Sequence, residues 1–134
     1  MDREGVGDGV GETHSDPLSE TLGISFDRIE AGLATTSLTV GDEHLNANGK
    51  LHGAMIFALA DAAAGAVGQG DDETVVGIET NTSFLGAVDR GEHVVATAEV
   101  THESSRFNET QVSIEKEDGT AVATYRVRGY RIEE

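Results

Sequence analysis

Hydrophobic and polar positions alternate in two runs between Ile24 and Val40, and the alternation breaks at Glu30-Ala31-Gly32. A period of two is typical of a strand with one buried face, so the pattern predicts a strand, a turn and a second strand. Residues 41–50 are mostly polar and include Asn46, Asn48 and Gly49, which suit turns. We therefore expect a loop over 41–50.

The pattern changes completely over Gly53–Gly68. Between Ala54 and Val67 the only charged or polar residue is Asp61, and no proline interrupts the run. This composition predicts a helix. A helix that is apolar on all sides is normally buried on all sides, so we expect this one to lie in the core.

The rest of the chain alternates again. The expected strands are Thr74–Leu85, His93–Glu103, Phe107–Lys116 and Thr120–Ile132. Turn residues separate them at 89–92 and at Asp118-Gly119, a strong hairpin signal. No helix lies between these strands, which favours an antiparallel sheet. The predicted fold class is α+β, with one antiparallel sheet wrapped around one long buried helix.

The length of 134 residues favours a single domain. Residues 1–17 hold four glycines and few apolar side chains, so we expect a disordered or loosely ordered acidic tail there. The domain is then 18–134. Aromatic residues make up only 4% of the chain, which predicts a thin core and a second subunit that covers the helix or a sheet edge.

Charge changes the expected partners. The 25 acidic residues outnumber the 9 basic ones, and the formal net charge is −16. Such a surface repels phosphates, so nucleic acid is not an expected partner. Only Lys50 and Lys116 are lysines. An acidic, lysine-poor composition indicates adaptation to a salt-rich cytoplasm, because salt screens the self-repulsion. An ordinary acidic protein is the alternative.

Several classes of site and location are not expected. No stretch is long and apolar enough to span a membrane, and no secretory signal is visible at the start, so we expect a cytoplasmic protein. Cysteine is absent, which excludes disulfides and thiolate chemistry. The five histidines lack metal-binding spacing, so no metal and no cofactor is expected. Neither a Gly-x-Ser-x-Gly elbow nor a phosphate-binding loop is present.

Asp61 is the first candidate for chemistry. A buried carboxylate needs a partner, an altered pKa or access to a cleft. The alternatives are a structural ion pair with a C-terminal arginine, or simple exposure to solvent.

His52 and Gly53 lie where the loop meets the predicted helix. The first helical turn has free N–H groups at a positive dipole end, which suits an oxyanion or a polarised carbonyl. Alternatively, Gly53 only makes a tight turn and His52 only caps it.

The spacing of these candidates constrains any shared chemistry. Gly53 and Asp61 are separated by eight residues on one helix, or roughly 12 Å along its axis. One small reacting centre cannot easily touch both from the same chain. A catalytic role for both therefore predicts a dimer with paired sites at its interface.

The run from Asn46 to Asp61, Asn-Ala-Asn-Gly-Lys-Leu-His-Gly-Ala-Met-Ile-Phe-Ala-Leu-Ala-Asp, resembles the signature of PaaI-like hotdog-fold acyl-CoA thioesterases. Asn46 stands six residues before His52, and Asp61 stands nine after it, as in that signature. The later Asn81-Thr82-Ser83-Phe84-Leu85 is similar to the family's strand before its Phe-Leu-x-Pro segment, although Gly86 and Val88 stand where proline is usual. The resemblance covers about Leu18 to Ile132.

The resemblance implies roles for four residues. Asp61 would be the general base or the nucleophile, and the N–H of Gly53 would polarise the thioester carbonyl. Asn46 would help to place the water or the carbonyl, and His52 would support the loop. The implied substrates are acyl-coenzyme A thioesters, often with aromatic acyl groups such as phenylacetyl. The implied assembly is a dimer or a dimer of dimers, with Asp61 opposite the neighbour's Gly53.

Other positions are candidates for substrate binding. Ala54 replaces the second glycine of the signature and narrows the room at the carbonyl. Thr80 and Ser83 are polar candidates in the strand after the helix. The phosphates of coenzyme A need positive charge, for which Lys50, Arg90, Arg106 and the Arg126/Arg128 face are candidates, unless each only pairs with surface carboxylates.

Two alternatives remain open at this point. One is a hotdog dehydratase or hydratase, for which His52 and Asp61 are poorly arranged. The other is a non-catalytic acyl-CoA binding or regulatory module that kept the fold. The presence of Asn46, Gly53 and Asp61 together argues against that module.

Overall fold

The computed structural model describes residues 14–67 and 74–132. Its elements are α2 (Pro17–Leu22), β1 (Ser25–Glu30), β2 (Leu33–Thr39), the 3-10 turn η2 (Asp42–His44), α3 (Gly53–Val67), β3 (Thr74–Phe84), β4 (His93–Glu103), β5 (Phe107–Lys116) and β6 (Ala121–Ile132). The expected helix and strands are confirmed to within one residue at their ends.

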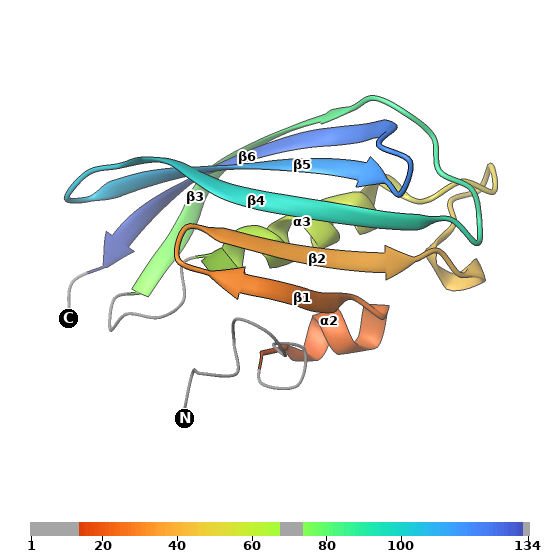
Figure 1. Cartoon of the computed structure of the whole chain (residues 1–134), viewed down its shortest axis with the longest axis horizontal. Coiled ribbons are helices and arrows are strands. Elements are labelled where there is room, and N and C mark those ends of the chain that lie inside the picture. Colours follow the sequence, from red (N-terminus) through yellow and green to blue (C-terminus); the bar gives the residue numbers. More distant parts are fainter. Residues whose placement is uncertain (1–13, 68–73, 133–134) are drawn as a thin grey trace.

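The strands form one antiparallel sheet that curves over α3 (Figure 1). Its six strands lie in the order β1-β2-β4-β5-β6-β3. The predicted α+β architecture is therefore confirmed. Among the described residues, the strand that follows the helix, β3, pairs only with β6 and forms one edge of the sheet, and β1 forms the other.

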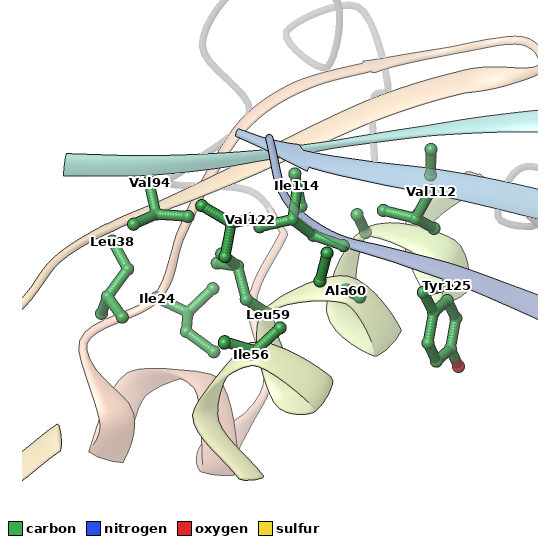
Figure 2. Close-up of a cluster of buried hydrophobic side chains, with 14 of the residues drawn as sticks. Ile24, Leu38, Ile56, Leu59, Ala60, Val94, Val112, Ile114, Val122 and Tyr125 are labelled. Carbon is green, nitrogen blue, oxygen red and sulfur yellow. The ribbon is translucent and has the colours of Figure 1, made fainter. Parts of the chain in front are cut away.

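One face of α3 packs tightly on the sheet. Leu59, Ala60 and Ala63 are completely buried. Opposite them lie branched side chains of the inner sheet face, among them Val94, Val112, Ile114 and Val122 (Figure 2). Alanine on the helix lets the backbone come close to the sheet, so a core with few aromatic residues still fills its volume.

No segment of the described residues covers the opposite face of α3. Ala54, Phe57, Asp61 and Gly65 are exposed, and their spacing places them along one side of the helix. The expectation that the helix is buried on all sides is wrong for a single chain. A single sheet reaches only one face of a helix, and the other face stays open to a second element.

A short helix, α2, begins inside the segment that the sequence assigned to a loose tail. The side chain of Asp16 accepts a hydrogen bond of 2.7 Å from the Ser19 N–H, and Pro17 occupies the first turn. Gly23 ends the helix with φ at +80°. These are ordinary start and stop signals that our sequence analysis missed. Residues 1–13 of the expected tail lie outside the described residues.

A buried side-chain hydrogen bond ties the sheet to the helix. The hydroxyl of Thr36 in β2 is completely buried and donates to the Leu59 carbonyl at 2.8 Å. Replacement of Thr36 by valine keeps the shape but removes the donor. We expect Thr36→Val to lower the free energy of unfolding by about 1 kcal/mol in chemical denaturation. Thr35→Val, on the other face of the same strand, is the matched control and should change it far less.

Candidate active site

Asp61 lies on the open face of α3 and is held by a tyrosine. The hydroxyl of Tyr125 in β6 donates to Asp61 Oδ1 over 2.5 Å. In the described parts of the chain, no lysine, arginine or histidine forms an ion pair with Asp61. Of the outcomes that the sequence left open, Asp61 is both partnered and exposed to solvent, and its partner is a phenol and not a C-terminal arginine.

Tyr125 is almost completely buried although its hydroxyl meets an exposed carboxylate. Burial raises the pKa of Tyr125 well above its ordinary value, and the hydrogen bond and negative charge of Asp61 raise it further. The phenol is therefore a permanent donor at physiological pH. In Figure 2, Tyr125 lies at one end of the buried cluster.

The N-terminus of α3 is capped by the histidine before it. His52 Nδ1 accepts a hydrogen bond of 2.9 Å from the Ala54 N–H, which places the ring proton on Nε2. Among the described residues, no acceptor is recorded for the Gly53 N–H. A Cβ at Gly53 would lie 3.3 Å from the Phe84 ring, which is a tight contact. Glycine therefore keeps a space between the helix start and this ring.

The loop before the helix is organised by Asn46. Its Oδ1 accepts hydrogen bonds from the N–H groups of Asn48 and Lys50, at 2.9 and 3.0 Å. Its backbone N–H donates to the Lys50 carbonyl at 2.7 Å. In the single chain Asn46 thus shapes the loop that leads to the helix, and its Oδ1 is already occupied.

A second histidine supports this loop and was not anticipated. His44 is buried, its Nδ1 accepts from the Gly41 N–H at 2.9 Å, and its Nε2 lies 2.7 Å from the Leu22 carbonyl. His44 therefore links α2 to the loop. Its carbonyl also accepts a hydrogen bond from the His52 N–H at 2.9 Å.

The sheet separates the two polar candidates of β3. Thr80 lies opposite Val127 in the register, on the helix side, because Val127 packs against the core. Ser83 lies opposite Thr124, on the outer face. Only Thr80 therefore shares a face with Tyr125 and Asp61 in the single chain.

The basic candidates lie away from Asp61 within the chain. Lys50 pairs with Asp89 at 2.6 Å, and Arg90 pairs with Asp42 at 3.0 Å. Arg126 faces Glu79 and Glu109 on the outer side of the sheet, at 3.6 and 3.9 Å.

Arg106 lies in the β4–β5 turn and donates to the Tyr130 hydroxyl at 2.8 Å. The antiparallel register places that turn at the end of the sheet where β3 begins. Gly53 lies at the other end, next to Phe84. Arg106 and Gly53 of one chain therefore cannot contact the same reacting group of a substrate.

The chain thus brings together some of the expected residues. Asn46, His52, Gly53 and Ala54 gather at the start of α3, and Asp61 lies two turns further along the same exposed side. Sequence reasoning missed Tyr125. The signal that could have found it is the alternation along β6. Tyr125 falls on the same, core-facing side as the apolar residues Ala123 and Val127, so its hydroxyl is expected to need a partner there.

Over 14–67 and 74–132, no group of three histidine, aspartate or glutamate side chains is arranged to hold a metal ion. In the same ranges no helix is both long and apolar enough to cross a membrane.

Comparison with known proteins gives the family. The family model of the thioesterase superfamily matches residues 48–123. The chain is 27% identical to the acyl-coenzyme A thioesterase PaaI of Escherichia coli over 118 residues, covering 88% of this chain and 84% of that protein. It is 35% identical to the 1,4-dihydroxy-2-naphthoyl-CoA hydrolase of Listeria monocytogenes over 106 residues, covering 75% and 85% of the two chains.

Solved structures agree with this assignment. The structure of the E. coli PaaI protein from the phenylacetic acid degradation operon superposes with a TM-score of 0.85 at 26% identity, and covers 91% of this chain and 88% of that one. The resemblance inferred from the Asn46–Asp61 signature is thereby confirmed. The chain belongs to the thioesterase superfamily, as a thioester hydrolase with the PaaI-like hotdog fold.

Proposed function

We propose that this protein hydrolyses acyl-coenzyme A thioesters to a free acid and coenzyme A, with Asp61 and Gly53 at the reacting centre. The observation that carries the proposal is the position of Asp61. It is the only charged residue of α3, and its carboxylate lies on the exposed face of an otherwise apolar helix. The Gly53 N–H at the helix start supplies a donor at the positive dipole end.

The proposed centre needs a second copy of the chain. Gly53 and Asp61 are roughly 12 Å apart along one helix. Phe57 and Asp61 on the open helix face contact Tyr125 of β6, which is the strand next to the edge strand β3. The outer backbone groups of β3 pair with no strand among the described residues. Exposed apolar side chains follow this edge at Val76, Ile78 and Phe84. Both features suit pairing with another β3.

Two-fold symmetry then fixes which residues meet. Phe57 lies midway between Gly53 and Asp61 and is exposed. If the two helices run antiparallel and cross near Phe57, each Asp61 comes opposite the partner's Gly53. A dimer of dimers would contain the same pair of sites.

The chemistry follows from these groups. A water molecule attacks the thioester carbon while Asp61 accepts its proton, and the carbonyl oxygen takes the negative charge beside the Gly53 N–H. Collapse of this intermediate breaks the carbon–sulfur bond, and the thiolate of coenzyme A leaves and takes up a proton. If Asp61 instead attacks the carbon itself, the carbon–sulfur bond breaks, the thiolate of coenzyme A leaves and takes up a proton, and a mixed anhydride forms. Water then hydrolyses the anhydride to the free acid and restores Asp61.

The acyl group is proposed to be aromatic, of the phenylacetyl type. Phe57 packs edge-on against Tyr125 with ring centroids 5.3 Å apart, and Phe84 lies beside Gly53. These rings border both ends of the proposed centre. The names of two relatives, the PaaI thioesterase and a dihydroxynaphthoyl-CoA hydrolase, also fit an aromatic acyl group.

Asp61→Asn tests the reaction itself. We expect kcat for thiol release to fall about 10²- to 10⁴-fold, because asparagine can neither accept the water's proton nor act as nucleophile. The assay is thiol release from a panel of aromatic and aliphatic acyl-coenzyme A substrates at high potassium chloride, with the oligomeric state of the variant measured beside it. An intact wild type that turns over no substrate would favour a binding module and overturn the proposal.

Mixing of two inactive variants tests the shared site. Gly53→Pro removes the N–H donor at a helix position that tolerates proline. Gly53→Ala adds a carbon atom but keeps the donor, and so controls for the added bulk. Co-refolded Asp61→Asn and Gly53→Pro chains form mixed dimers in which one site of two is intact, so we expect about a quarter of the wild-type rate. Sites that lie within one chain would recover nothing, and Asp61→Asn mixed with itself is the control.

The acidic surface leads to a proposal on salt. Most basic side chains that the structure describes already pair with carboxylates, while the chain carries a net charge of −16. Because 1 M salt shortens the screening length to about 3 Å, we expect the melting temperature to rise steadily between low and molar potassium chloride. Sodium chloride should act equally. A melting temperature that is flat or falls with salt contradicts adaptation to a salt-rich cytoplasm.

A further inference from the structure

We propose that Tyr125 is a positioning residue for the reaction, which fixes Oδ1 of Asp61 and leaves Oδ2 as the oxygen that acts on the substrate. This inference rests on the proposed function of Asp61 and assigns a role to a residue on the last strand. The signature around the helix does not include this residue.

The contact is short and directional. The phenol of Tyr125 donates to Asp61 Oδ1 over 2.5 Å, at the short end of the range for a hydroxyl that meets a carboxylate. In the described residues no hydrogen bond to Oδ2 is recorded. One oxygen of the carboxylate is therefore committed and the other faces the open side of α3.

The ring of Tyr125 is buried and packed by its neighbours, as expected of a residue that positions another side chain. Tyr125 is only 2% exposed, and its strand neighbours Val112 on β5 and Thr82 on β3 lie directly opposite it in the register. Phe57, one turn before Asp61, packs against the ring. Two strands and the helix thus fix the ring, whereas an exposed aspartate on a helix would otherwise turn freely about its side-chain bonds.

Fixing one oxygen supports the reaction in two ways. It holds the carboxylate in one rotamer, so that the second oxygen keeps a constant place relative to the partner's helix start. The negative charge also stays on Asp61, because the buried phenol donates the hydrogen bond and keeps its proton. The raised pKa of Tyr125 supports this division of roles.

Tyr125→Phe removes only the hydroxyl and keeps the ring in the core. We expect kcat to fall roughly 10- to 100-fold, because the carboxylate loses its fixed direction, while KM changes less than about twofold. The assay is thiol release from the best acyl-coenzyme A of the panel, with melting temperature and oligomeric state measured for each variant. Thr124→Val, which removes a hydroxyl from the outer face of the same strand, is the matched control and should keep the wild-type kcat.

Three kinetic outcomes decide the assignment. An unchanged kcat in Tyr125→Phe overturns it. A raised KM with unchanged kcat also overturns it, since the tyrosine would then bind substrate instead of orienting Asp61. A wild type without thioesterase activity overturns the proposed function and the assignment with it, and the titration below then shows whether the contact itself exists.

A titration tests the contact without any substrate. The chain has two tyrosines, so Tyr130→Phe leaves Tyr125 as the only phenol. In this background we expect the ultraviolet absorbance of the phenolate to appear only at strongly alkaline pH, and Asp61→Asn to move its onset to lower pH because the neighbouring negative charge is gone. Circular dichroism at each pH identifies the folded range. An onset that Asp61→Asn does not move means that the two side chains are not in contact, and overturns the assignment.

Discussion

A single carboxylate on an apolar helix sets the main constraint on this structure. The face of α3 that packs on the sheet holds Leu59, Ala60 and Ala63, where an ionised group would lose its hydration without compensation. Asp61 is therefore compatible with the fold only on the open face, where solvent reaches it. There the sheet contributes one hydroxyl, that of Tyr125, as its fixed partner. The proposed reactive group and the stable core thus lie on opposite sides of one helix.

The open face also bears on why the proposed site needs a second copy of the chain. Covering it with a third layer of the same chain would bury Asp61, whereas the proposed second copy along β3 would leave a space between the two helices. The exposed apolar side chains of β3, such as Ile78, lie where such a copy would pack. The acidic exterior opposes non-specific association, so the proposed pairing would be favoured where exposed apolar side chains and an unpaired strand edge coincide.

The fold could be predicted well from the sequence because the alternation of apolar and polar residues is clear and the turns contain typical turn residues. The break at Glu30-Ala31-Gly32, the apolar run over 53–68 and the Asp118-Gly119 hairpin each placed an element boundary correctly. Sequence reasoning overestimated the burial of α3, because periodicity reports which residues avoid water and not which chain covers them. It missed α2, whose Asp16-Pro17 start had been grouped with the glycine-rich residues before it.

The site shows the same division between local and long-range information. Asn46, His52, Gly53 and Asp61 are close in sequence, so spacing alone could place them along one loop and one helix. Tyr125 is 64 residues from its partner, and only the register of β6 between β5 and β3 brings them together. A slip of one residue in that register would turn Tyr125 to the outer face and bring the neighbouring Thr124 or Arg126 toward Asp61. The bulge opposite Ile114/Glu115 lets both Val122 and Ala123 face the core. It therefore determines that Tyr125, two residues later, also faces the core. The direction of the Asp61 carboxylate therefore depends on how the last strand pairs, and the sequence around the helix alone does not predict that pairing.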